Sequence, residues 1–83
     1  MVLLVTPEAE RDLSRMPKAD RTRMVAALRQ VAAEPSVRQS FVTEMVGQAG
    51  LWRLRKGDWR ALYRIVDGDV VVDRVGNRRD IYR

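Results

Sequence analysis

Cysteine and histidine are both absent from this chain of 83 residues, and its apolar runs are short. Without cysteine the chain cannot be a disulfide scaffold, and without an apolar run of about 18 residues it carries no recognisable membrane span. The apolar start at residues 1–5 is too short for the core of a signal peptide, and it leads into Thr6-Pro7 instead of a small-residue cleavage site. Because metal-type ligands do not cluster either, we expect a cytoplasmic protein with no metal and no cofactor.

The length and the apolar content of the chain suit one compact domain. Hydrophobic residues make up 46% of the sequence, which is enough for one modest core but not for two. We therefore expect residues 1–83 to form a single domain. A domain of this size without disulfides or metal is held by packing alone or with help from a partner, so marginal stability is expected.

Basic residues exceed acidic ones, and the excess lies in the second half of the chain. Sixteen lysines and arginines against eleven aspartates and glutamates give a net charge of +5. Residues 51–83 hold nine basic and five acidic side chains, a net charge of +4. Most of the cations are arginines, whose planar guanidinium groups suit phosphate and carboxylate. The balance indicates a polyanionic partner, either nucleic acid or an acidic protein segment, although arginine-rich codon usage would give the same composition.

The spacing of apolar residues divides the chain into a helical first half and an extended second half. Residues 2–5 predict a strand, and Thr6-Pro7 supplies a hydroxyl N-cap and a first-turn proline for a helix that Pro17 closes. A second helix is predicted from residue 18 to about residue 34, where Pro35 ends it. The period then changes to two, which predicts strands at residues 41–46, 51–55, 59–66 and 69–75. This order predicts an α+β fold: an N-terminal strand, a two-helix hairpin, then a three- to four-stranded antiparallel sheet packed on the helices.

The turns set how the predicted strands pair. Asp67-Gly68 is a two-residue hairpin loop in which both residues tolerate positive φ, and it fixes the register of the last two strands. The preceding turn, within residues 55–58, is predicted to place Arg53 opposite Arg60. Like charges that face each other across strands are destabilising unless an anion or a carboxylate lies between them. We therefore expect a negative group there, which is either a ligand or Asp73 on an ordinary solvated face with ion pairs.

In this register the predicted sheet has an apolar face and a basic face. The apolar face suits two covering helices, and its residues are Trp52, Leu54, Trp59, Ala61, Tyr63, Ile65, Val70 and Val72. The basic face holds Arg53, Arg55, Arg60, Leu62, Arg64, Val71, Asp73 and Val75. The aromatic residues could instead be stacking platforms for single-stranded RNA, but their phase favours the core. Arg74 has the phase of the apolar face and is expected to reach water at the sheet margin.

Two segments of the second half resemble the RelE/ParE superfamily of small bacterial toxins. Residues 50–65 (GLWRLRKGDWRALYRI) are similar to the central segment of RelE-type toxins, with an arginine strand, a Gly-Asp turn, an aromatic-Arg pair and a tyrosine three residues later. Residues 75–82 (VGNRRDIY) are similar to the closing Val-Gly-x-Arg segment with its late tyrosine. The resemblance implies a RelE-like fold and a toxin that enters the ribosomal A site, cuts mRNA and thereby inhibits translation. It also implies a cognate acidic antitoxin, bound in a hetero-oligomer.

The resemblance further implies roles for individual residues. Arg60 and Arg78 would bind the scissile phosphate and stabilise the charge of the pentavalent transition state, and Arg53 would add a phosphate contact. Tyr82 would stack on a base or handle a proton near the 2′-hydroxyl. These four are the predicted catalytic residues. The predicted contacts to RNA or the ribosome are Arg55, Lys56, Arg64, Arg79 and Arg83.

The chain departs from the family pattern where proton transfer is concerned. Leu51 stands where the best-known members carry a lysine, and Arg53 replaces another lysine. Arginine is a poor general base because it hardly loses its proton, and the usual ribonuclease histidine is missing. Two other functions therefore stay open: a ParE-like toxin that inhibits DNA gyrase without cutting RNA, and a catalytically inactive basic module that binds an acidic partner. Tyr82 could also simply pack over the sheet edge.

Overall fold

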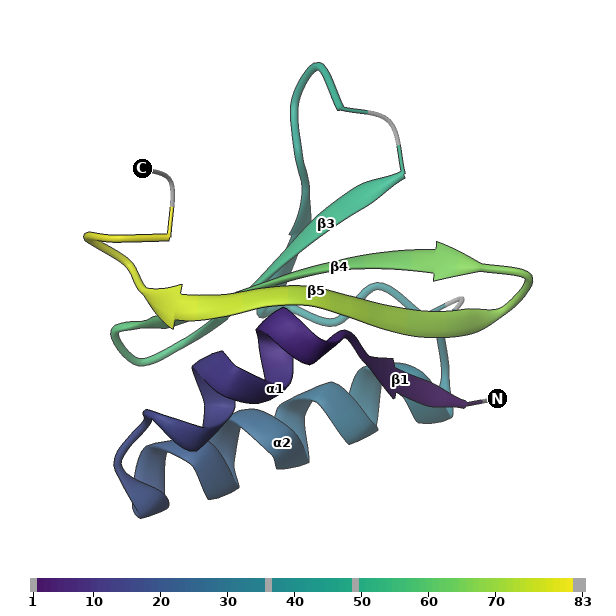
Figure 1. The fold of residues 1–83 in the computed structure, drawn as a ribbon. Helices are drawn as coiled ribbons and strands as arrows, with labels where there is room; N and C mark the ends of the chain where they lie inside the picture. The colour runs from purple at the N-terminus through teal and green to yellow at the C-terminus, as the bar shows by residue number, and fades with distance from the viewer. Residues whose placement is uncertain (1, 36, 49, 82–83) are drawn as a thin grey trace.

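The computed structural model describes residues 2–35, 37–48 and 50–81, which form two helices and five strands (Figure 1). In chain order these are β1 (Leu3–Val5), α1 (Pro7–Ser14), α2 (Lys18–Ala33), β2 (Val42–Glu44), β3 (Leu51–Lys56), β4 (Trp59–Val66) and β5 (Asp69–Asn77). Strands β2 to β5 pair antiparallel in succession, and β1 joins β5 in parallel, so the sheet order is β1-β5-β4-β3-β2. The predicted α+β order is confirmed, and the parallel pairing of β1 adds a fifth strand to the sheet.

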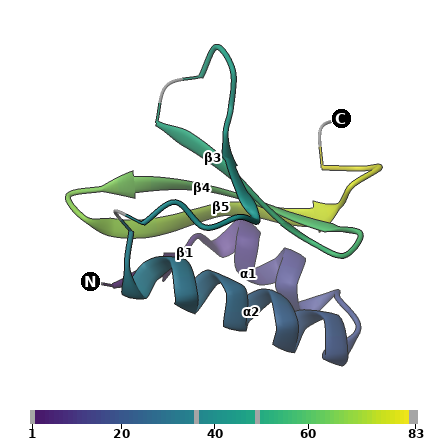
Figure 2. The same ribbon diagram turned by 180° about the vertical axis from the view of Figure 1, so that it is seen from behind.

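Both helices lie on the same face of the sheet (Figure 1 and Figure 2). The strand residues on that face with 1% exposure or less are Leu54, Ala61, Tyr63, Val70 and Val72. Partly buried side chains pack against this core, among them Trp52, Trp59 and Ile65. The predicted apolar face is therefore confirmed. Neither helix in the part of the chain that the structure describes has the length and apolar character of a membrane span.

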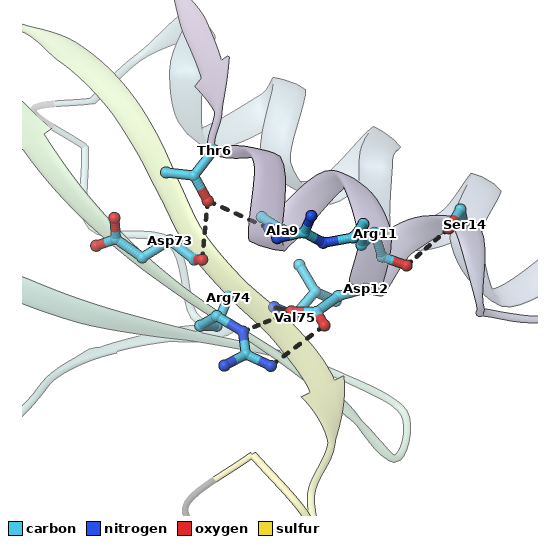
Figure 3. A network of polar contacts seen from close by, with 8 residues as sticks. All are labelled: Thr6, Ala9, Arg11, Asp12, Ser14, Asp73, Arg74 and Val75. Atoms are coloured by element: carbon cyan, nitrogen blue, oxygen red, sulfur yellow. Dashed lines mark hydrogen bonds and ion pairs between the residues drawn. The ribbon is translucent and has the colours of Figure 1, made fainter.

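Thr6 fixes both the start of α1 and its position along β5 (Figure 3). Its hydroxyl oxygen accepts the N–H of Ala9 at 3.2 Å, as a helix N-cap does, and Pro7 occupies the first turn. The same hydroxyl donates to the carbonyl of Asp73 at 3.0 Å, and the Thr6 N–H donates to the carbonyl of Val72 at 3.0 Å. One threonine thus joins the helix start to the neighbouring strand.

Asp12 occupies the edge of β5 beyond the point where β1 ends (Figure 3). Its Oδ2 atom accepts the backbone N–H of Val75 at 2.9 Å and Nε of Arg74 at 2.8 Å. Burial of the Asp12 carboxyl acts to raise its pKa, but the hydrogen bonds from Arg74 and Val75 and the charges of Arg74 and Arg15 together bring the pKa below the ordinary value of 3.8. Arg74 was expected to reach water at the sheet margin, and its side chain is 58% exposed there. The guanidinium also forms the ion pair with Asp12.

The hairpin loop between β3 and β4 is Gly57-Asp58, with Gly57 at a φ of +59°. The register of these two strands consequently differs by two residues from the predicted one, and Arg55 instead of Arg53 lies opposite Arg60. Because the side-chain period of a strand is two, this shift leaves every side chain of β3 and β4 on its predicted face. Two arginines therefore do face each other across β3 and β4, but the residue on β3 is Arg55 and not Arg53.

The register of β4 and β5 begins as predicted and then changes at a β-bulge. The Asp67-Gly68 loop has positive φ at both residues, 52° and 84°, as the sequence indicated. Between Leu62 and Tyr63, however, the pairing on β5 skips Asp73. Residues beyond the bulge change face as a result. Val75 is 3% exposed in the core, so its predicted place on the basic face is wrong.

Replacing Asp12 by alanine is expected to destabilise the fold, because the Val75 N–H would lose its acceptor. The loss should be about 1 to 3 kcal/mol of unfolding free energy, measured by chemical denaturation. Asp12→Asn keeps an oxygen acceptor and should lose less. Asp20, which forms a surface ion pair with Arg23 on α2, offers a matched control, and Asp20→Ala should cost about 1 kcal/mol or less. Equal losses for the two aspartates would contradict a special role for Asp12.

The contribution of Asp12 should also depend on pH. Its folded-state pKa is depressed, so its stabilising effect is fully present above the pKa of the unfolded chain and disappears as the pH falls through the folded-state pKa. The stability difference between wild type and Asp12→Asn should therefore shrink below pH 3.8. A difference that stays constant down to about pH 2 would argue against a charged Asp12 in the folded protein.

Candidate anion-binding site

An open pocket lies on the basic side of the sheet, and we call it the arginine pocket. Its volume is about 560 Å³, and its lining residues are Ser40, Phe41, Thr43, Arg53, Arg55, Arg60, Arg78 and Arg79. The β2–β3 hairpin and the segment after β5, which supply most of the lining, both project away from the helices (Figure 1). None of the described lining residues is acidic. The pocket is thus strongly cationic.

The five arginines come from three parts of the chain. Arg53 and Arg55 alternate along β3, and Arg60 on β4 lies opposite Arg55. Arg78 and Arg79 belong to the turn that follows β5. Arg53 and Arg60 are half-buried and the other three are exposed. Because fixed cations in a hollow add their potentials, this arrangement favours an anionic ligand.

The turn after β5 is tied down at two points. The Arg78 N–H donates to the carbonyl of Asp58 at 2.8 Å, and the Arg78 guanidinium lies 3.6 Å from the Asp58 carboxylate. Asn77 closes the turn, because its side-chain oxygen accepts the N–H of Arg79 at 3.1 Å and its carbonyl accepts the N–H of Ile81 at 3.1 Å. The direction in which the chain leaves β5 is therefore set by Asn77 and by the β3–β4 loop.

Arg60 is positioned by backbone carbonyls. Its Nη1 donates to the carbonyls of Gly57 and Trp59, each at 2.9 Å. A guanidinium carries five N–H donors, so contacts with carbonyls and with a phosphate are compatible. These bonds fix the side chain beside the β3–β4 loop, next to the turn that carries Arg78.

The structure brings together five of the nine residues that the sequence singled out, namely Arg53, Arg55, Arg60, Arg78 and Arg79. Arg64 lies outside the pocket in a bidentate pair with Asp73, at 2.7 and 2.9 Å, so Asp73 neutralises Arg64 and not the pocket. Lys56 lines a separate hollow of about 280 Å³ near Trp59. Tyr82 and Arg83 lie outside the described residues.

Three lining residues were missed by the sequence reasoning: Ser40, Phe41 and Thr43. They lie at or just before β2, whose strand signal was weak because it is three residues long. A usable signal was present in the alternation there. Val42 is 5% exposed and pairs with Leu54 of the core, so the residues on either side of it face the pocket.

The large aromatic residues of β3 and β4 belong to the core and not to the arginine pocket. Trp52 stacks on Tyr63 with ring centroids 6.5 Å apart, and Tyr63 is 1% exposed. Burial raises the pKa of Tyr63 to about 12, which keeps its hydroxyl neutral. The interpretation of these rings as core residues is therefore confirmed, and Tyr63 is no candidate for proton transfer.

The protein thus combines a layered α+β fold with a cationic pocket on the face of the sheet that the helices leave uncovered. The sequence also matches the family described as the ParE toxin of type II toxin-antitoxin systems, parDE, over residues 3–82. The chain belongs to this family, and it is a RelE/ParE-like toxin of a type II toxin–antitoxin system. The predicted membership of the RelE/ParE superfamily is thereby confirmed.

Solved structures agree with this membership. The RelBE toxin–antitoxin complex from Mycobacterium tuberculosis shares 30% identity, with 93% of this chain and 96% of that chain covered and a TM-score of 0.77. The matching chain of the RelB–RelE complex from Methanococcus jannaschii is 20% identical, with 95% of this chain and 94% of that chain covered and a TM-score of 0.81. The isolated RelE toxin from E. coli is 18% identical, with 98% of this chain and 89% of that chain covered and a TM-score of 0.80. No curated protein sequence matches the chain.

Removing a pocket arginine is expected to lower the salt dependence of RNA binding. Each phosphate contact to a single strand contributes about 0.7 to the slope of log affinity against log salt concentration. Arg53→Gln and Arg55→Gln should each reduce that slope by about 0.7, measured by fluorescence anisotropy with a short RNA. Arg23→Gln, on the outer face of α2, is the control and should leave the slope unchanged. The same reduction in all three variants would indicate diffuse surface charge instead of a site.

Removing the side chain of Asn77 is expected to disturb the pocket more than the fold. Asn77→Ala deprives the Arg79 N–H of its acceptor, so RNA affinity should fall about two- to tenfold with little change in melting temperature. Asn77→Ser, whose hydroxyl can accept the same bond, should recover most of the affinity. If all three proteins bind RNA equally well, other contacts hold the turn.

Proposed function

We propose that this toxin is a ribosome-dependent mRNA endoribonuclease that inhibits translation. The observation that supports the proposal is the convergence of five arginines on one open pocket without an acidic residue in its described lining. Guanidinium groups bind phosphate through paired, charge-assisted hydrogen bonds. A cluster of them in one hollow suits a phosphodiester better than a flat protein surface. The similarity in fold to RelE toxins agrees with this choice.

In the proposed reaction the RNA supplies its own nucleophile. The 2′-hydroxyl attacks the neighbouring phosphorus, the O2′–P bond forms and the P–O5′ bond breaks. Arg60 and Arg78 bind the non-bridging oxygens and stabilise the added negative charge of the pentavalent transition state, and Arg53 makes a further phosphate contact. The proton of the 2′-hydroxyl passes to a base, and the departing O5′ takes one up.

Proton transfer is not a task for the arginines, because a guanidinium hardly loses its proton. Tyr82 is the proposed residue for moving a proton or stacking on a base at the 2′-hydroxyl. Alignment of the RNA on the ribosome lowers the demand for a strong base, since in-line geometry itself accelerates the attack. The proposed contacts to RNA or ribosome phosphates are Arg55, Lys56, Arg64, Arg79 and Arg83.

Inhibition of DNA gyrase without RNA cleavage is the second candidate function. The matching family is named for ParE toxins, and none of the described lining residues is a conventional general base. Under this alternative the arginine pocket binds an acidic protein surface or DNA phosphates without chemistry. A third possibility of the same kind is a catalytically inactive module whose basic pocket only binds an acidic partner.

We also propose that an acidic antitoxin silences this toxin in a cytoplasmic hetero-oligomer. The solved relatives from Mycobacterium tuberculosis and Methanococcus jannaschii are toxin–antitoxin complexes. A segment with carboxylates and apolar anchors that folds as it wraps the toxin would suit both the charge of the pocket and the small core. Carboxylates paired with Arg53, Arg60 or Arg78 would then exclude RNA from the same site.

Cleavage of mRNA on ribosomes, assayed beside gyrase supercoiling, separates the two candidate functions. Arg60→Ala and Arg78→Ala should each lower the cleavage rate by about 100-fold or more, because each removes a donor to the charge of the transition state. Arg78→Lys should be intermediate, since lysine keeps the charge but not the bidentate geometry. Arg29→Ala, exposed on α2, is the control. Gyrase inhibition by a wild-type protein that leaves mRNA intact would refute the ribonuclease proposal.

A further inference from the structure

Phe41 gives the arginine pocket an aromatic wall. It is half-buried, packing against the hydrophobic core while also lining the pocket. It is the one aromatic residue among the described lining residues. A residue that packs against the core and also lines the pocket offers an apolar surface beside the guanidinium groups.

The backbone holds Phe41 at a set position relative to the arginines. Its carbonyl accepts the N–H of Arg55 at 2.9 Å, and Thr43, two residues further, pairs with Arg53 across β2 and β3. The aromatic side of the pocket and the cationic side are therefore carried by two directly bonded segments. The backbone of Phe41, in the turn just before β2, is thus bonded directly to the strand that carries Arg53 and Arg55.

The pocket is also larger than a phosphate requires. Its volume of about 560 Å³ falls within the range of about 300 to 1,000 Å³ of pockets that hold small organic ligands. A nucleotide unit combines an anionic phosphate, a hydroxylated sugar and a flat base. The lining offers matching partners: arginines, the hydroxyl groups of Ser40 and Thr43, and the ring of Phe41. Unpaired bases bind proteins mainly by stacking on aromatic side chains and by hydrogen bonds along their edges.

We propose, on the basis of the RNA-cutting function above, that Phe41 is a base-stacking residue of this toxin. The base of an unpaired nucleotide whose phosphate is held by the arginines stacks on the Phe41 ring, and Ser40 and Thr43 contact the edge of that base or its ribose. Phe41 thereby selects RNA with a displaced, single-stranded base at the pocket. The arginines supply affinity for any phosphate, and the β2 side supplies the preference for a nucleotide.

The first test needs no variant. Purified full-length toxin is titrated with a short single-stranded RNA carrying 2-aminopurine, whose fluorescence is quenched when it stacks, and with the same RNA carrying an abasic site at that position. The RNA with the base should bind about 5- to 100-fold more tightly than the abasic one, and its fluorescence should fall on binding. Equal affinities, or binding without quenching, overturn the proposal.

A pair of variants then assigns the effect to Phe41. Phe41→Leu keeps an apolar contact with the core but has no ring, whereas Phe41→Tyr keeps the ring. The leucine variant should lose about tenfold in affinity for the base-bearing RNA together with the quenching, and the tyrosine variant should retain both. Binding of inorganic polyphosphate should be unchanged in both variants because the arginines are intact. A parallel loss of RNA and polyphosphate binding in Phe41→Leu would mean that Phe41 only supports the fold, which overturns the proposal.

These measurements use neither ribosomes nor cleavage, so the two proposals fail separately. Ribosomal mRNA cleavage by the wild type, combined with equal binding of base-bearing and abasic RNA, overturns the stacking site and leaves the ribonuclease standing. Quenching that depends on Phe41, in a protein that never cuts mRNA, supports the stacking site and removes the ribonuclease.

Discussion

The N-cap residue of α1 and one side chain within α1, and not a neighbouring strand, hold the edge of β5 beyond Val72. The pairing with β1 stops at Val72, and Thr6 and Asp12 bind the next part of the strand. Because a buried backbone N–H needs a partner, the bond to Asp12 satisfies the Val75 N–H, which lies beyond the end of β1 and two residues after the bulge at Asp73. The bulge in turn sets the face of every later residue of β5. The strand that leads into the turn with the last two pocket arginines is thus held from its outer edge by the first helix.

Most of the close ion pairs lie away from the arginine pocket, and among the pocket arginines Arg78 has a carboxylate, that of Asp58, at 3.6 Å. The two bidentate ion pairs of the described residues, Arg64 with Asp73 and Arg74 with Asp12, both lie outside the arginine pocket. They stabilise the strand around the bulge without lowering the positive charge of the pocket. Grouped cations repel one another, but on a surface open to water and salt that cost is reduced. The small core can therefore support a strongly cationic hollow, whose charge any anionic ligand would then relieve.

Local chemistry made much of this structure predictable from sequence, and non-local pairing accounts for what was missed. The conformations of Thr6-Pro7 and Asp67-Gly68 are determined by the side chains and φ preferences of these residues themselves. The helix start and the last hairpin loop were therefore predicted correctly. The two-residue shift of β3 against β4 left the faces intact, which is why the arginines were grouped correctly in spite of a wrong register. The bulge at Asp73 has no comparable sequence signal, because a polar residue in a strand does not show from its type whether it pairs with the neighbouring strand or is skipped. The parallel place of β1 likewise arises only when distant segments meet.

The bulge also divides β5 into two segments that differ in their register against β4, so the strand responds differently to substitutions and to changes of length. Residues 69–72 pair with β4 in the register that the Asp67-Gly68 loop sets. Residues 74–77 pair with β4 in a register that is shifted by one residue, because Asp73 is skipped. A point substitution on either side changes one side chain, but loss of a single codon between them would rejoin the two registers. Val75 would then turn out of the core, and the chain would leave the sheet towards the opposite side, carrying the pocket arginines with it. In-frame changes of length are thus poorly accommodated along the last strand.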